Sequence, residues 1–81
     1  MTQVNLKAYW ADFTAESALS ISGVDWELIK RGGEKTFEAT AFYEGGTEIV
    51  AWNFANATVT IFGEGAAQHL IDAPLEELVV C

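Results

Sequence analysis

The sequence predicts an α+β domain in which an antiparallel meander of four or five strands carries one or two short helices on one face. Two observations lead to this fold class. Apolar and polar residues alternate with a period of two over most of the chain, which is the pattern of strands buried on one side. Glycine pairs, Gly32–Gly33 and Gly45–Gly46, interrupt the alternation, and such pairs favour the tight turns of hairpins. With 81 residues, the chain is expected to form a single domain, 1–81.

The expected elements follow from this pattern in order along the chain. Strands are predicted at about 3–10, 24–31, 35–43, 47–54 and 57–62, and short helices at about 14–21 and 66–72. Thr14 is a candidate N-cap for the first helix, although the alternation of Leu19 and Ile21 also permits a strand there. Pro74 ends the second helix. Residues 75–80 then form either a helical turn or a closing strand, and their β-branched end favours the strand.

Two-residue loops at the breaks allow the registers of the predicted hairpins to be compared. In all three hairpins the apolar residues of 24–31, 35–43, 47–54 and 57–62 fall on one face. Large residues then meet small ones, because Trp26 and Trp52 both flank Ala39. A slip of one residue would scatter this set over both faces, so the agreement indicates a four-stranded meander over residues 24–62.

The opposite face of this meander carries the candidate partner-binding residues, which are Asp25, Glu27, Glu38, Phe42, Ile49 and Phe62. In the predicted register Glu27 directly opposes Glu38, and like charges opposed across strands destabilise a sheet by about a few tenths of a kcal/mol. A sequence selected only for folding would rarely contain such a pair. The face is therefore interpreted as an acidic surface with an apolar anchor for a basic partner protein. Alternatively, it is a solvated sheet face whose apolar end is covered by other segments.

Twelve Asp and Glu against four Lys and Arg give the chain a net charge of −8. Direct binding of nucleic acid or of an anionic membrane needs cations against phosphate, so both are excluded as partners. No apolar run reaches the roughly 18 residues of a transmembrane helix, and the N-terminus lacks a signal-peptide pattern, so a cytoplasmic protein is expected. Taken alone, the acidity fits salt adaptation or solubility as well as a partner.

Residues that carry most protein chemistry are scarce. His69 is the only histidine and Cys81 the only cysteine, so neither an intramolecular disulfide nor a cysteine-rich zinc site is expected. Asp72 follows His69 by three residues, but one histidine with carboxylates is a weak metal site. Glu27 and Glu38 would need a cleft to act as a catalytic carboxylate pair, and an open sheet offers little concavity. We therefore expect no catalytic residue, metal or cofactor, and a protein that is not an enzyme.

Small, acidic, single-domain α+β chains without a catalytic constellation resemble inhibitor and adaptor proteins of phages and mobile elements, including anti-CRISPR and DNA-mimic proteins. The resemblance lies in size and charge, and it implies no site residue. The first hypothesis is thus a non-enzymatic protein-binding module, of inhibitor or nucleic-acid-mimic type, that occupies a basic surface of a partner protein. The alternative is a structural subunit of a virion or homo-oligomer that assembles through sheet edges or through the patch around Phe42.

Overall fold

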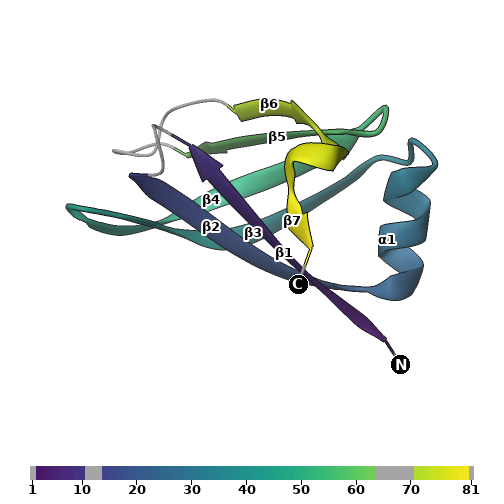
Figure 1. Ribbon diagram of the computed structural model, residues 1–81, viewed down its shortest axis with the longest axis horizontal. Helices are drawn as coiled ribbons and strands as arrows, with labels where there is room; N and C mark the ends of the chain where they lie inside the picture. The colour runs from purple at the N-terminus through teal and green to yellow at the C-terminus, as the bar shows by residue number, and fades with distance from the viewer. Residues whose placement is uncertain (1, 11–13, 64–70, 81) are drawn as a thin grey trace.

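One antiparallel sheet of seven strands dominates the computed structural model, which describes residues 2–10, 14–63 and 71–80 (Figure 1). The strands are β1 (Gln3–Trp10), β2 (Ala15–Ser22), β3 (Lys35–Tyr43), β4 (Gly46–Ala55), β5 (Thr58–Gly63), β6 (Ile71–Pro74) and β7 (Val79–Val80). Helix α1 (Gly23–Lys30) follows β2, and a 3₁₀ turn, η1 (Leu75–Glu77), separates β6 from β7. The strands lie in the order β6–β5–β4–β3–β2–β1–β7. The broad α+β class is confirmed, with more strands than expected.

The two edge strands of this sheet are close together in the sequence, because only residues 75–78 separate β6 from β7. The step from Pro74 to Val79 spans at most about 17 Å when fully extended. Six strand spacings of about 4.8 Å would hold the edges of a flat sheet about 29 Å apart. The sheet therefore curls into a half-barrel. Figure 1 shows the chain passing through η1 from β6, at one edge of the sheet, to β7, at the other edge.

The concave side of the half-barrel holds the hydrophobic core. Its large, almost wholly buried apolar side chains are Leu6, Ile29, Val50, Trp52, Phe54, Val59 and Ile61. Along β4 and β5 they alternate with more exposed residues, so the period of two in the sequence is the inside–outside alternation of the sheet. Leu78 is buried and Leu75 packs against the core, so the connection between the edge strands also covers the open side of the curl.

Two hydrogen bonds that share the buried Ser17 hydroxyl join three strands of the sheet. The indole N–H of Trp52 on β4 donates to the Ser17 hydroxyl on β2 over 3.0 Å. The same hydroxyl donates to the backbone carbonyl of Thr40 on β3 over 2.9 Å. Ser17 is 1% exposed and Trp52 is wholly buried, so neither polar group can turn to water instead.

Residues 24–31, predicted as a strand, form helix α1 instead, and one reason lies at its N-terminus. The Ser22 hydroxyl accepts a hydrogen bond from the backbone N–H of Asp25 over 3.1 Å, which is the bond of a helix N-cap. Asp25 also places a negative charge in the first turn, where the helix dipole favours it, and Lys30 places a positive charge in the last turn. The prediction of a strand here was wrong because these helix signals outweigh the short apolar alternation.

The second reason lies at the C-terminus of α1. The N–H of Gly33 donates to the carbonyl of Leu28 over 2.9 Å, and the N–H of Gly32 donates to that of Ile29 over 3.0 Å. These are the two bonds of a Schellman motif, whose first residue past the helix needs the positive φ that Gly32 adopts, 92°. The first glycine pair therefore ends a helix and does not turn a hairpin.

Residues 14–21, predicted as a helix with Thr14 as its cap, belong to strand β2, so that prediction was also wrong. The strand that the sequence also permitted is the one formed, and its alternate residues are buried: Ala15, Ser17, Leu19 and Ile21. β2 pairs with both β1 and β3, and it occupies the place beside β3 that was predicted for 24–31. As a result Glu27 does not oppose Glu38.

The remaining strands of the predicted meander are found, with small changes in bounds and register. The predicted ranges 3–10 and 35–43 match β1 and β3, whereas β4 and β5 differ by one residue at each end from 47–54 and 57–62. The turns fall at residues 44–45 and 56–57, so Phe37 pairs with Trp52 and not with Phe54. Because each register moves by two residues, every side chain keeps its predicted face.

The C-terminal region combines the two structures left open for it. Residues 75–80 form η1 and then β7, which pairs with β1. The predicted helix 66–72 falls mainly on residues 64–70, which lie outside the described residues, and Ile71 begins β6. Among the described residues, no helix has the length and apolar character needed to cross a lipid bilayer.

The buried bond between Ser17 and Trp52 leads to the first prediction. Ser17→Ala is expected to lower the free energy of unfolding by about 1–3 kcal/mol, because it leaves the buried indole N–H without an acceptor. Ser20→Ala, the same change on the exposed side of β2, is expected to cost no more than about 0.5 kcal/mol. Urea denaturation measures both, and equal losses would contradict the role of the buried bond.

The turn between β4 and β5 leads to the second prediction. Asn56 and Ala57 have φ values of 53° and 59°, a conformation in which alanine is strained and glycine is not. Ala57→Gly is therefore expected to raise the free energy of unfolding by about 0.5–1 kcal/mol. Ala55→Gly, in the extended part of β4, is expected to lower it by a similar amount, about 0.5–1 kcal/mol. Thermal or urea unfolding measures both variants, and free energies of unfolding that change in the same direction would contradict the prediction.

Candidate protein-binding face

The convex side of the half-barrel leaves large apolar side chains in solvent. Phe42 on β3 is 49% exposed, Ile49 on β4 is 61% exposed and Phe62 on β5 is 39% exposed. These three residues, called the outer stripe below, were predicted from the sequence as the apolar anchor. They all point away from the core because each lies at an outward position of its strand.

The strand registers bring the outer stripe together as one diagonal line. Phe42 pairs with Thr47 and Ile49 pairs with Thr40, so Phe42 and Ile49 are diagonal neighbours across β3 and β4. Phe62 pairs with Ala51, two residues beyond Ile49 on β4, which makes it the next diagonal neighbour. Diagonal neighbours in a sheet lie about 7–8 Å apart, within reach of aromatic side chains. The stripe is thus continuous over three strands.

Acidic side chains lie along one side of the outer stripe. Glu16 on β2 pairs with Phe42, and Glu38 on β3 pairs with Ala51, the residue that separates it from Phe62. An open hollow of about 600 Å³ lies beside Ile49 and Phe62, with Glu38 and Glu48 also in its lining. Of the two acids beside the stripe, Glu16 and Glu38, the sequence had singled out only Glu38, since Glu16 fell in a segment interpreted as a helix.

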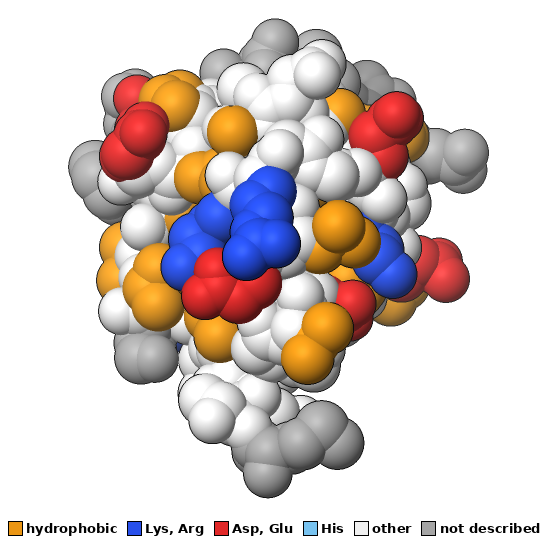
Figure 2. Space-filling view, turned by 90° about the vertical axis from the view of Figure 1, so that its right-hand side faces the viewer, with side chains coloured by type: hydrophobic (Ala, Val, Ile, Leu, Met, Phe, Trp, Pro, Cys, Tyr) orange, Lys and Arg blue, Asp and Glu red, His pale blue; other side chains and the backbone are white. Residues whose placement is uncertain are grey.

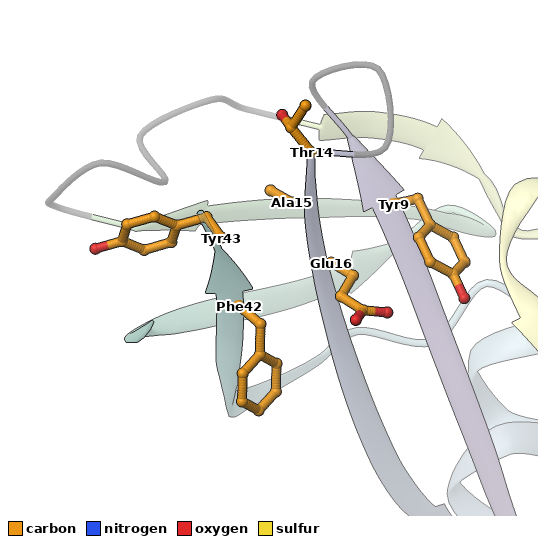
Figure 3. Close-up of a pocket in the computed structure, with 6 residues that line it drawn as sticks. All are labelled: Tyr9, Thr14, Ala15, Glu16, Phe42 and Tyr43. Atoms are coloured by element: carbon orange, nitrogen blue, oxygen red, sulfur yellow. The ribbon is translucent and has the colours of Figure 1, made fainter. Parts of the chain in front are cut away.

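A second hollow, of about 350 Å³, lies at the end of the face where β1, β2 and β3 meet (Figure 3). Tyr9, Glu16 and Phe42 form one row across these strands in the sheet register. Figure 3 shows their three side chains on the same side of the sheet, with Tyr43 pointing elsewhere. A carboxylate therefore lies between two aromatic side chains, which is an arrangement suited to a cationic group.

The two other acids predicted for this face lie elsewhere. Asp25 and Glu27 are on α1, which is not part of the sheet, so neither holds a strand position opposite Glu38. The Asp25 carboxylate forms an ion pair with Lys35 at 3.5 Å, and the Glu27 carboxylate pairs with Lys30 at 3.1 Å. Their charges are thus met within the chain, and they do not extend the acidic side of the outer stripe.

This ion pairing is part of an uneven distribution of charge. Residues 23–35, which include α1, hold three acidic residues and three basic residues and are neutral in sum. The rest of the chain therefore carries the whole net charge of −8, with Lys7 as its single basic residue. Figure 2 faces the α1 end of the molecule and shows basic side chains near its centre, next to acidic and hydrophobic ones. The excess of acidic residues therefore lies outside the segment that contains α1.

The part of the chain that the structure describes holds no group of three or more His, Cys, Asp or Glu side chains that could bind a metal ion. His69 and Cys81 lie outside the described residues. Glu27 lies on α1 and pairs with Lys30, so it does not oppose Glu38 across two strands as the carboxylate pair weighed from the sequence would require. The outer stripe and the acids beside it therefore form a candidate contact surface.

Compared with known protein families, with curated proteins and with solved structures, the chain matches none. Its function is therefore argued from its own surface.

The outward placement of the outer stripe leads to the third prediction. Ile49→Ala is expected to change the free energy of unfolding by no more than about 0.5 kcal/mol, because this side chain is mostly in solvent. Val50→Ala, one residue further along β4, is expected to cost about 2 kcal/mol, because Val50 is 2% exposed. Guanidinium denaturation of the two variants measures the contrast, and a larger loss at Ile49 would mean that the face is covered.

Proposed function

We propose that this protein is a non-enzymatic binding module whose outer face occupies a basic surface of a partner protein. The observation that carries the proposal is the outer stripe itself, an exposed diagonal of Phe42, Ile49 and Phe62 with Glu16 and Glu38 along one side. Contiguous exposed apolar side chains bordered by polar ones are typical of protein–protein contact sites.

The two kinds of side chain have different parts in binding. Phe42, Ile49 and Phe62 supply apolar area that leaves water on contact, and central aromatic anchors of this kind carry much of the energy of protein interfaces. Glu16 and Glu38 add orientation, because acids on rigid strands meet a basic surface in a fixed arrangement. The net charge of −8 raises the rate of encounter with any basic partner.

The class of partner follows from the same charge. Basic surfaces large enough to complement an acidic sheet are found on proteins that bind nucleic acid, where they face the phosphate backbone. Carboxylates of the outer face would take the place of phosphates, so the module acts as an inhibitor of nucleic-acid-mimic type. Proteins of this kind occur in phages and mobile elements, and an anti-CRISPR-like role fits the size and charge.

Assembly through sheet edges, the alternative function, has less support. β7 has two residues and β6 has four, the last of them Pro74, which lacks a backbone N–H. Short edge strands and edge prolines are devices that prevent edge-to-edge pairing. The outer stripe lies on β3, β4 and β5, which each have a neighbouring strand on both sides. These strands therefore offer side chains to a partner, and their backbone groups are already paired.

Capture from a lysate of the source cells tests the proposal and gives the fourth prediction. Immobilised wild-type protein is expected to retain a basic protein at 50 mM NaCl and release it at 500 mM, with mass spectrometry identifying it. Glu16→Lys/Glu38→Lys is expected to slow association with that protein by about tenfold and to flatten its salt dependence. Phe42→Ser/Ile49→Ser is expected to speed dissociation, since it removes apolar anchors.

The matched control is Glu76→Lys/Glu77→Lys, which makes the same change in net charge on the exposed η1 turn. It is expected to slow association by less than about threefold, because these residues are outside the outer face. Equal effects of the two charge reversals would mean that only net charge attracts the partner. Unchanged binding by both outer-face variants would show that the binding site lies elsewhere.

A further inference from the structure

One end of the outer face combines an acid with two aromatic rings. Tyr9 pairs with Glu16 across β1 and β2, and Glu16 pairs with Phe42 across β2 and β3. Tyr9 is 37% exposed and Phe42 is 49% exposed, whereas Glu16 between them is half-buried. We call these three residues the acid–aromatic row. By contrast Glu38, the other acid beside the outer stripe, is exposed and pairs with the small Ala51.

Two hollows meet at the acid–aromatic row. The hollow of about 350 Å³ described above lies at the end of the sheet, and a smaller one of about 110 Å³ is lined by Lys7, Glu16, Ser17, Ala18 and Phe42. Glu16 and Phe42 belong to the lining of both. Pockets for small-molecule ligands measure about 300–1,000 Å³ and enclose most of the ligand. The larger hollow is open to solvent, so it suits a side chain of a partner better than a free small molecule.

The Glu16 carboxylate is available to a cation from outside the chain. In the described part of the chain, no ion pair or hydrogen bond engages the Glu16 side chain. Lys7 lies diagonal to Glu16 in the register of β1 with β2, but the two do not form an ion pair. Because Glu16 is half-buried, water and salt screen its charge less than that of an exposed acid. It therefore attracts an arriving cation more strongly.

The spacing of the row lets one cation contact both rings. Two strand spacings of about 4.8 Å separate Tyr9 from Phe42, and Glu16 lies midway. A cation held at the Glu16 carboxylate thus comes within the roughly 6 Å of each ring over which cation–π attraction acts. Figure 3 shows all three side chains on the same side of the sheet. A divalent metal ion would need more oxygen ligands than one carboxylate supplies.

Arginine fits this arrangement better than lysine does. A guanidinium is planar, so it stacks on aromatic faces while it donates two parallel hydrogen bonds to one carboxylate. The lysine ammonium is a compact charge that holds its water more strongly and has no flat face to stack. The two rings on either side of the carboxylate therefore favour the guanidinium.

We infer that the acid–aromatic row binds an arginine side chain of the basic partner protein, with the guanidinium on the Glu16 carboxylate and between the Tyr9 and Phe42 rings. This inference rests on the proposed function, because it names the partner residue that one end of the outer face holds. Arginine is the side chain that proteins favour for recognising phosphate and nucleic acid. Glu16 then takes the place of a phosphate, while Ile49 and Phe62 supply the apolar contacts.

Titration of the isotope-labelled full chain with two peptides tests the inference and gives the fifth prediction. Acetyl-Gly-Arg-Gly-amide and acetyl-Gly-Lys-Gly-amide carry the same charge, so the net charge of −8 attracts both alike. The arginine peptide is expected to shift the backbone N–H signals of Glu16, Ser17 and Phe42 in a saturable way in NMR spectra. Its affinity is expected to exceed that of the lysine peptide about threefold.

Three variants separate the parts of the row. Glu16→Gln keeps the size of the side chain and removes its charge, and it is expected to weaken binding of the arginine peptide about fivefold or more. Phe42→Leu keeps an apolar side chain and removes the ring, which is expected to weaken binding about threefold and to bring the two peptides close together. The matched control is Glu77→Gln on the exposed η1 turn, which makes the same change in net charge and is expected to leave the affinity within about 1.5-fold.

Several outcomes overturn the inference. They are equal affinities of the two peptides, a loss in Glu77→Gln as large as in Glu16→Gln, and the absence of a saturable shift at Glu16 with 50 mM arginine peptide. None of them bears on the capture of a basic protein from a lysate, since Ile49, Phe62 and Glu38 remain as its contacts. Conversely, peptide binding without capture of any basic protein would leave the arginine site in place and contradict the proposed function.

Discussion

The short connection between the two edge strands is the constraint on which the rest of the structure depends. Residues 75–78 are too few to cross the width of a flat seven-stranded sheet, so β6 and β7 can both form only if the sheet curls. The curl gives an 81-residue chain a concave side deep enough to bury Trp52 and Phe54 completely or nearly so. It also makes the other side convex, where large side chains find few neighbours and remain in solvent.

Much of the sheet could be predicted from the sequence because the alternation of inward and outward side chains along a strand survives a register error of two residues. The predicted registers of β3 with β4 and of β4 with β5 were wrong by two residues, yet Phe42, Ile49 and Phe62 kept their outward positions, since a strand repeats its faces every second residue. Prediction failed where one pattern has two structural meanings. Gly32–Gly33 suits both a hairpin and a helix end, and only the hydrogen bonds to the last turn of α1 decide between them.

The candidate site was predicted in part, for related reasons. Its apolar residues follow from the inside–outside alternation of the strands alone. Its acidic residues depend also on which strand lies beside β3. The alternation ending in Leu19 and Ile21 was a signal that could have assigned β2 and, with it, Glu16 to the outer face. Ser22, three residues before Asp25, was a further signal for the start of a helix. The ion pair between Asp25 and Lys35 had no local signal, because it joins a helix to the following strand.

The buried hydroxyl of Ser17 has a consequence for how the chain finds one alignment among several. A shift of β3 or β4 by two residues keeps every apolar side chain inside, so hydrophobic burial discriminates poorly between such alignments. The indole of Trp52 does discriminate between these alignments, because its N–H reaches the Ser17 oxygen only when β2, β3 and β4 are all aligned as observed. Any other alignment leaves a buried polar group without a hydrogen-bond partner. A single serine thus fixes the alignment of three strands, and it selects the one alignment in which the outer stripe forms.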